Sequence, residues 1–305
     1  NEYATNDIVM IYHADMYACP GLDEHILKHI KPGTVVSATR IEPPLHPDGP
    51  EKILHDCGIE PEEFDEPKLM KFLENVDKDK ELSKGIFAPW MVYKKEFLDM
   101  GGHDPILKSC REDSDVFNRM QLDGFTFKQP WNSLVYHLTG RGAGSFSGDE
   151  ERHKEWQKEM QNSTKEFIRK WGTGVQHDNL LKPIVSPFYN KGIVLKNATY
   201  ELLELLEPWC TNIYTDGFLK EYLEKENDNT EYTLGWRLRE FKEIPQNDII
   251  IFIDGSKFTQ EDFNMFQQLS RVLEQDKPKS GTFELGSFKI KVNKYEEKIY
   301  NRIYS

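Results

Sequence analysis

An α/β fold is predicted by two continuous apolar runs and by the helical patterns that follow them. Residues 7–12 read DIVMIY and residues 248–253 read DIIIFI. Runs of this kind are typical of strands that are buried on both faces of a mostly parallel sheet. Strand and helix patterns alternate after each run. We therefore expect a mixed sheet flanked by helices, followed by a second, smaller α/β unit at the C-terminus.

The composition is that of an acidic globular chain. Its 305 residues are 38% hydrophobic and 12% aromatic, which is enough for the cores of two modest domains. The net charge of −13 argues against broad nucleic-acid binding and against docking on an anionic membrane through a basic patch. A diphosphate-bearing ligand stays compatible with this charge, because a bound divalent cation neutralises such a group locally.

The cysteines and the hydropathy pattern bear on the compartment. None of the four cysteines forms a CxxC pair, so neither a zinc ribbon nor a dense disulfide framework is expected. No apolar run approaches the roughly 20 residues of a transmembrane helix, and no signal peptide opens the chain. We therefore expect a cytoplasmic protein without a transmembrane segment.

Residues 1–148 are expected to form the first domain. A helix over residues 22–30 carries apolar residues on one face and stops at Lys31-Pro32-Gly33. Residues 42–67 are rich in Pro, Asp and Glu and predict a long surface loop. The other predicted strands cover residues 34–39, 85–93, 125–128 and 133–137, and the other predicted helices cover residues 72–82, 95–100 and 113–123.

Residues 149–181 are expected to form a helical linker, and residues 182–305 a C-terminal α/β unit of open role. The linker helix, over residues 150–171, is strongly charged and predicts a solvated face with a few inward apolar residues. In the C-terminal unit we expect strands over residues 193–196, 212–215, 232–238 and 248–253, and helices over residues 200–206, 219–226 and 260–273. Four tryptophans are expected to pack in cores, namely Trp131, Trp171, Trp209 and Trp236.

The two apolar runs belong to an internal similarity. Residues 6–15 read NDIVMIYHAD, and residues 247–256 read NDIIIFIDGS. The simpler interpretation is that any buried strand that enters a loop has this pattern. The alternative is a second, degenerate Rossmann-like half in the C-terminal unit.

The first candidate site follows the strand of residues 7–12. Ligands of open α/β sheets bind beyond the carboxyl ends of the strands, and His13 and Asp15 lie at such an end. Two apart in an extended segment, these side chains point the same way. A hard divalent cation takes carboxylate oxygens and bound phosphates. Asp15 is therefore a candidate metal ligand, and His13 its possible partner.

The second candidate site is the sequence REDSD at residues 111–115, where a helix is predicted to begin. Acidic residues in a first helical turn can simply cap the helix and interact with its dipole. The functional interpretation is that Glu112 or Asp113 is a general base, because attack by a hydroxyl group requires removal of its proton.

The third candidate site is the sequence YHLTGRG at residues 136–142. A lone histidine at the end of a strand, such as His137, is more often structural than a ligand. Here it precedes a glycine-rich loop, residues 139–148, that contains Arg141. An arginine in such a loop can stabilise charge on a departing diphosphate, and the loop can order over a donor and exclude water.

The order of these motifs resembles the second half of an inverting, family-2 glycosyltransferase with a GT-A fold, over about residues 5–148. His13-Ala14-Asp15 stands where that family has its DxD motif, Glu112-Asp113 resembles the family's ED motif, and His137 its late histidine. An aromatic strand and a GG.D turn lie between them. The resemblance implies that Asp15, His137 and His13 hold Mn²⁺ or Mg²⁺, that Asp113 is the catalytic base, and that His13 and Arg141 contact the donor. It also implies an acceptor site formed by Trp90, Gly102, His103 and Asp104.

The chain departs from this family in two respects. His13 replaces the first Asp of the DxD motif, which changes how a metal is held. The family's nucleotide-binding half would precede the DxD strand, where this chain has only a few residues. Either that half is missing from the chain or another segment replaces it, and residues 182–254 have the required rhythm of strands and helices.

Three functions follow from these patterns. The first is a metal-dependent glycosyltransferase that moves a sugar from a nucleotide-sugar donor to a carbohydrate acceptor. The second is a non-catalytic carbohydrate-binding or assembly module on a decayed transferase scaffold. The third is a nucleotidyltransferase, which uses a similar sheet and metal. The donor sugar, the linkage and the oligomeric state stay open.

Overall fold

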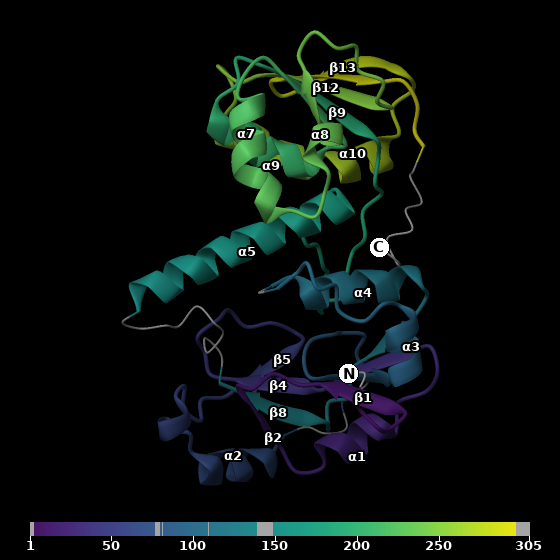
Figure 1. Ribbon diagram of the computed structural model, residues 1–305. Helices are drawn as coiled ribbons and strands as arrows, with labels where there is room; N and C mark the ends of the chain where they lie inside the picture. Colours follow the sequence, from purple (N-terminus) through teal and green to yellow (C-terminus); the bar gives the residue numbers. More distant parts are fainter. Residues whose placement is uncertain (1–2, 77–79, 81, 109, 139–148, 297–305) are drawn as a thin grey trace.

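A computed structural model describes residues 3–76, 80, 82–108, 110–138 and 149–296. Three mixed sheets flanked by helices make up the protein, so the predicted α/β class is confirmed. Two sheets belong to an N-terminal unit, from β1 to β8, and the third belongs to a C-terminal unit, from β9 to β14; a long helix, α5, lies between the units (Figure 1). No helix in the described part of the chain is long and apolar enough to cross a membrane.

The first sheet has the strand order β1-β6-β3-β7. Its strands are β1 (Ile8–Ile11), β6 (Trp90–Tyr93), β3 (Thr34–Ser37) and β7 (Thr126–Lys128). β6 pairs antiparallel with β1 and β3, whereas β7 is parallel to β3. Because β1 lies at the edge of the described sheet, most of its residues are only half-buried, and the expectation of burial on both faces is wrong for this strand.

The second sheet has the order β2-β8-β4-β5. Its strands are β2 (Met16–Ala18), β8 (Leu134–His137), β4 (Thr39–Glu42) and β5 (Lys52–Leu54). β3 and β4 are separated only by Ala38, whose N–H donates to the Pro89 carbonyl, while the next N–H, of Thr39, donates to Ser133. The apolar run predicted as one strand therefore passes from the first sheet into the second.

Four α-helices and one short 3-10 helix complete the N-terminal unit. They are α1 (Leu22–Leu27), η1 (Pro61–Glu63), α2 (Glu66–Leu73), α3 (Lys94–Asp99) and α4 (Glu112–Leu122). The helix predicted over residues 72–82 is misplaced, because α2 begins earlier, where the Asp65 side chain accepts a hydrogen bond from the Lys68 N–H. The predicted loop of residues 42–67 also contains β5 and η1.

The third sheet has the order β11-β10-β9-β12-β14-β13. Its strands are β9 (Lys191–Lys196), β10 (Asn212–Thr215), β11 (Leu238–Glu240), β12 (Ile249–Asp254), β13 (Gly281–Leu285) and β14 (Phe288–Val292). The first four strands in this order run parallel, and β14 and β13 form an antiparallel hairpin that the sequence analysis missed.

The helices of the C-terminal unit are α6 (Tyr200–Leu206), η2 (Glu207–Trp209), α7 (Leu219–Glu226), η3 (Asn227–Asn229), α8 (Leu234–Arg237), α9 (Gln260–Gln267) and α10 (Leu269–Asp276). The predicted bounds of α6 and α7 are correct. The strand predicted over residues 232–238 is wrong, because most of it forms α8 and the strand β11 only begins at Leu238. The helix predicted over residues 260–273 is two helices, α9 followed by α10.

The internal similarity in sequence has a structural counterpart. In the N-terminal unit, β1 pairs antiparallel with β6, which pairs antiparallel with β3. In the C-terminal unit, β12, β14 and β13 have the same order and directions. The two strands with similar sequences, β1 and β12, therefore occupy equivalent places, although only β12 has a parallel neighbour, β9, on its other side.

The helix α5 (Glu150–Trp171) joins the two units through its last turn. Arg169, which is fully buried, binds Glu207 and Glu226 of the C-terminal unit at 2.6 and 2.7 Å. The next residue, Lys170, binds Asp104 and Asp115 of the N-terminal unit at 2.6 and 2.9 Å. The end of this charged helix is thus buried between the units; the expected inward packing of Phe167 and Ile168 is confirmed, whereas the burial of charged residues such as Arg169 was not expected.

We predict that Arg169→Met destabilises the protein by about 3–5 kcal/mol, because removal of a buried cation takes from Glu166 its ion-pair partner and leaves Glu207 and Glu226 with one cation each, Arg237 and Lys165. The carboxylates concerned are Glu166, Glu207 and Glu226. Urea unfolding followed by circular dichroism measures the change. The control is Lys220→Met, which removes a 90% exposed cation and should change stability by less than about 0.5 kcal/mol. Equal effects of the two changes would contradict the prediction.

Candidate functional site

The carboxyl end of β1 places His13 and Asp15 at the boundary between the first two sheets. After Ile11 the chain turns and enters β2 at Met16. The Asp15 carbonyl accepts a hydrogen bond from the Leu138 N–H at 3.0 Å, which continues the pairing of β2 with β8. This pairing brings Asp15 next to His137, the last residue of β8.

Asp15, His137 and Glu42 form a line of side chains. The Nε2 atom of His137 lies 3.4 Å from Oδ2 of Asp15, and its Nδ1 atom lies 2.9 Å from Oε1 of Glu42. Glu42 is buried and is also bound by Arg40 at 2.5 Å and by Lys52 at 3.0 Å. Both ring nitrogens of His137 therefore have carboxylate partners, which fix the orientation of the imidazole.

The electrostatic environment keeps this line of side chains charged. Burial acts to lower the pKa of His137, but hydrogen bonds with Asp15 and Glu42 outweigh it and raise the pKa. Burial acts to raise the pKa of Glu42, but His137 and Arg40 hold that pKa at about 2. The hydrogen bond with His137 is the main reason that the pKa of Asp15 is lowered.

Asp113 is the centre of a second group, His13–Asp113–His103. Its Oδ1 atom lies 3.3 Å from Nε2 of His103, and its Oδ2 atom lies 3.4 Å from Nε2 of His13. Burial acts to raise the pKa of Asp113, but these two hydrogen bonds hold the pKa at about 2. With both oxygens engaged and so low a pKa, the carboxylate by itself is a weak proton acceptor in this arrangement.

The acidic residues at the start of α4 do not cap it. Arg111 stands at the N-cap with a left-handed φ of 72°, and no side chain forms a capping hydrogen bond there. Asp113 faces the two histidines instead. Glu112 takes no part in the group, and its Oε2 atom is buried without a hydrogen-bond partner among the described residues.

Aromatic rings connect the two groups and support them. Phe87 lies next to both His13 and His137, with ring centroids 6.1 and 6.2 Å apart. Trp90 is fully buried, and its ring packs edge-on against His103. Trp90, which was expected to line an acceptor site, instead supports His103 from inside the core in this structure.

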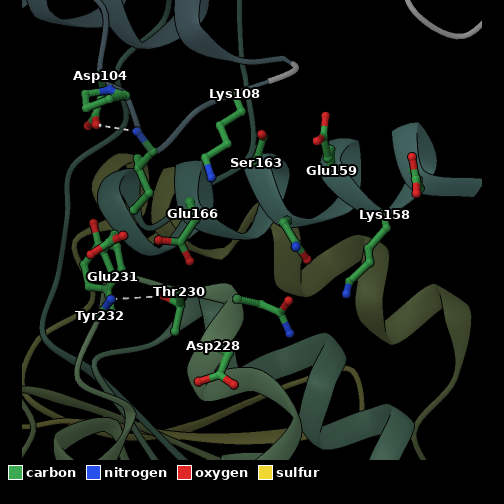
Figure 2. A pocket seen from close by; sticks show the side chains of 15 residues that line it. Asp104, Lys108, Lys158, Glu159, Ser163, Glu166, Asp228, Thr230, Glu231 and Tyr232 are labelled. Atoms are coloured by element: carbon green, nitrogen blue, oxygen red, sulfur yellow. Dashed lines mark hydrogen bonds between the residues drawn. The ribbon is translucent and has the colours of Figure 1, made fainter. Parts of the chain in front are cut away.

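The other residues expected at the acceptor site, Gly102, His103 and Asp104, follow the turn at Gly101 and have different partners. Gly102 has a left-handed φ of 66°, and its carbonyl accepts a hydrogen bond from Arg119 at 2.6 Å. His103 faces Asp113. Asp104 instead binds Lys170 and lines a cleft of about 830 Å³ between α5 and residues 228–232. Figure 2 shows this cleft, with Glu166 pointing from α5 toward Thr230.

A divalent cation fits the first group better than the second. Asp15 offers a carboxylate, and Nε2 of His137 would bind a cation only after losing its proton and its contact with Asp15, with Glu42 still orienting the ring from behind, as carboxylates do for metal-bound histidines. His13 is turned toward Asp113. No group of three or more metal-ligating side chains occurs among the described residues, so oxygens of a bound phosphate and water would complete the shell of Mn²⁺ or Mg²⁺.

Arg141 and the glycine-rich loop of residues 139–148 are outside the described residues. In the C-terminal unit, the backbone N–H groups that follow β9 are taken by one of the chain's own carboxylates. Asp216 accepts hydrogen bonds from the N–H groups of Asn197 and Ala198 at 2.8 and 3.0 Å, in the position where an anionic ligand would bind.

Sequence reasoning missed Glu42 and Arg40. A signal was present, because these charged residues stand two apart in an otherwise apolar strand run, and alternate residues of a strand share a face. A charge inside such a run requires a partner. Glu42 had been assigned to the start of a surface loop, so its contact with His137, 95 positions away, could not be inferred.

The chain was compared with protein-family models and with curated proteins, and neither comparison gives a match. The case for a function therefore rests on the two side-chain groups and on the elements that hold them.

We predict that His137→Gln lowers the melting temperature more at about pH 5.5 than at about pH 9. The pKa of His137 is raised in the folded protein, so its proton adds stability below the ordinary value of 6.5, and this stability is lost as the pH rises through the raised value. Asp15 and Glu42 stay ionised over this range because their pKa values are lowered. Melting curves in EDTA measure the difference, and His46→Gln, on an exposed loop, is the control. An equal loss at both pH values would contradict the prediction.

Proposed function

We propose that the protein is an inverting, metal-dependent glycosyltransferase that moves a sugar from a nucleotide-sugar donor to an acceptor hydroxyl. One observation carries the proposal. The ends of β1 and β8, the start of α4 and the turn after α3 bring Asp15, His137, Asp113 and His103 together, and His13 and Phe87 connect the pairs. A pair proposed to bind a cation thus stands beside a group proposed to accept a proton, which is the combination that this reaction needs.

The charge balance of the first group supports a bound cation. Glu42 is matched by Arg40 and Lys52, and Arg40 also reaches Glu51 at 3.4 Å. Asp15 has only His137 opposite it among the ion pairs of the described residues. Mn²⁺ or Mg²⁺ bound here would supply positive charge beside the donor diphosphate. Arg141 remains a proposed donor contact.

The second group supports removal of a proton. In the reaction, the acceptor O–H bond breaks and its proton passes to the His13–Asp113–His103 group. The oxygen forms a bond to the anomeric carbon, and the bond from that carbon to the diphosphate breaks on the opposite side. The nucleoside diphosphate leaves with the bonding electron pair, and the configuration at the anomeric carbon inverts.

A non-catalytic carbohydrate-binding module is the second candidate. Both oxygens of Asp113 hold imidazoles, and His13 stands in place of a carboxylate, which favours a scaffold that binds without turnover. The binding of Asp216 to the N–H groups of Asn197 and Ala198 after β9 likewise favours a structural role for the C-terminal unit.

We predict that the protein with Mn²⁺ releases a nucleoside diphosphate from at least one nucleotide sugar, and that Asp113→Asn lowers this rate by about 10²–10⁴-fold. The control Asp99→Asn removes an exposed carboxylate, paired only with Lys95 in the same helix, and should leave the rate unchanged. Coupled detection of released nucleotide across a donor panel measures the rate. Release of pyrophosphate from a nucleoside triphosphate and a sugar phosphate would instead identify a nucleotidyltransferase. Binding of sugar without release of any product would identify the binding module.

A further inference from the structure

His103 is held rigidly beside Asp113. Its ring packs edge-on against Phe97 and Trp90, with centroids 5.3 and 6.2 Å away, and its Nε2 atom faces Oδ1 of Asp113 at 3.3 Å. Two aromatic contacts and one charged hydrogen bond leave the imidazole little freedom to rotate. A fixed ring of this kind keeps its second nitrogen, Nδ1, in one direction.

The backbone on either side of His103 is fixed by buried charges. Arg119 donates from its guanidinium to the carbonyls of Met100 and Gly102 at 2.5 and 2.6 Å, and it is itself held by Asp115 at 2.7 Å. On the other side of His103, Asp104 is tied to Lys170 of α5. The turn that carries His103 is therefore anchored before and after the histidine.

Nδ1 of His103 is open. It forms no hydrogen bond with any described residue, and it is absent from the buried polar atoms that lack a partner, so solvent reaches it. The side chain as a whole is 29% exposed. The oxygens of Asp113, in contrast, each have an imidazole partner. A hydroxyl group that approaches this group from solvent can reach Nδ1 of His103 without displacing any interaction.

We propose that His103, through Nδ1, accepts the proton of the attacking hydroxyl, and that Asp113 is the positioning residue behind it. The inference rests on the glycosyltransferase proposed above. The acceptor O–H bond breaks, its proton binds Nδ1, and the oxygen uses its electron pair to bond to the anomeric carbon as the nucleoside diphosphate leaves. The imidazolium that forms is stabilised by the carboxylate of Asp113 on its Nε2 side, as in other pairs of histidine and carboxylate.

His13 is the less suitable proton acceptor of the two histidines. It is two residues from Asp15, on the side of the group where a cation and the donor diphosphate are proposed to bind. His103 belongs to the turn after α3, which lies on the other side of Asp113. Asp113 therefore separates a donor-side imidazole from an acceptor-side imidazole.

The test is chemical rescue. We expect His103→Gly to lower kcat by about 10²–10⁴-fold with little change in KM. Added imidazole should raise the kcat of this variant by about tenfold or more. Asp113→Asn should also lower kcat but gain nothing from imidazole, because its His103 is still present. His46→Gly, at an exposed loop position, should keep the wild-type rate with and without imidazole.

A second variant separates chemistry from folding. His103→Gln keeps a polar side chain of similar size, and we expect it to match the wild-type melting temperature while it loses kcat. A wild-type kcat in His103→Gly, or an inactive His103→Gly that folds and gains nothing from imidazole, would overturn the inference. If His103→Gly does not fold, a wild-type kcat in His103→Gln would overturn the inference instead. Wild-type protein that turns over no nucleotide sugar would overturn the proposed function itself.

Discussion

Asp115 is a fully buried carboxylate, and much of the structure depends on how its charge is compensated. Arg119 lies 2.7 Å from one oxygen, and Lys170 and the Trp171 indole lie 2.9 Å from the other. A carboxylate in the interior is tolerated only with such a complete set of partners. These partners belong to α4 and α5, and Arg119 extends the same set of contacts to the turn at Gly102. One buried charge thus ties the helix of Asp113, the turn of His103 and the helix that meets the C-terminal unit.

Both side-chain groups of the candidate site pair imidazoles with carboxylates, but in a different order. In the first group, Glu42 is buried among cations and holds one nitrogen of His137, whose other nitrogen faces the partly buried Asp15. In the other group the carboxylate of Asp113 is in the middle and the imidazoles are outside. Under the proposed function, the first arrangement would hold a cation and the second would accept a proton.

The repeated strand arrangement shows how neighbours decide the use of a similar sequence. β1 and β12 have equivalent partners on one side, but β12 also has the parallel strand β9. Next to β9, the carboxylate of Asp254 is bound by Asn197 and Ser256. Asp15, at the end of the other strand, meets His137 from a second sheet. The same local pattern therefore leads to a loop carboxylate bound by its neighbours in one unit and to the candidate site in the other.

The sequence by itself determined the α/β class, the places of strands such as β1 and β12 and the bounds of the helices α5, α6 and α7. Periodicity, capping residues and apolar runs act over a few neighbouring residues, so they can be read locally. It also singled out Asp15, Asp113 and His137 as candidates. Only the tertiary structure decided which partners these side chains have, that Trp90 is buried while Trp236 is 72% exposed, and that Glu42 belongs to the site. The physical reason is that charge compensation and ring packing join residues far apart in the chain, and their distances depend on how the sheets and α5 pack together.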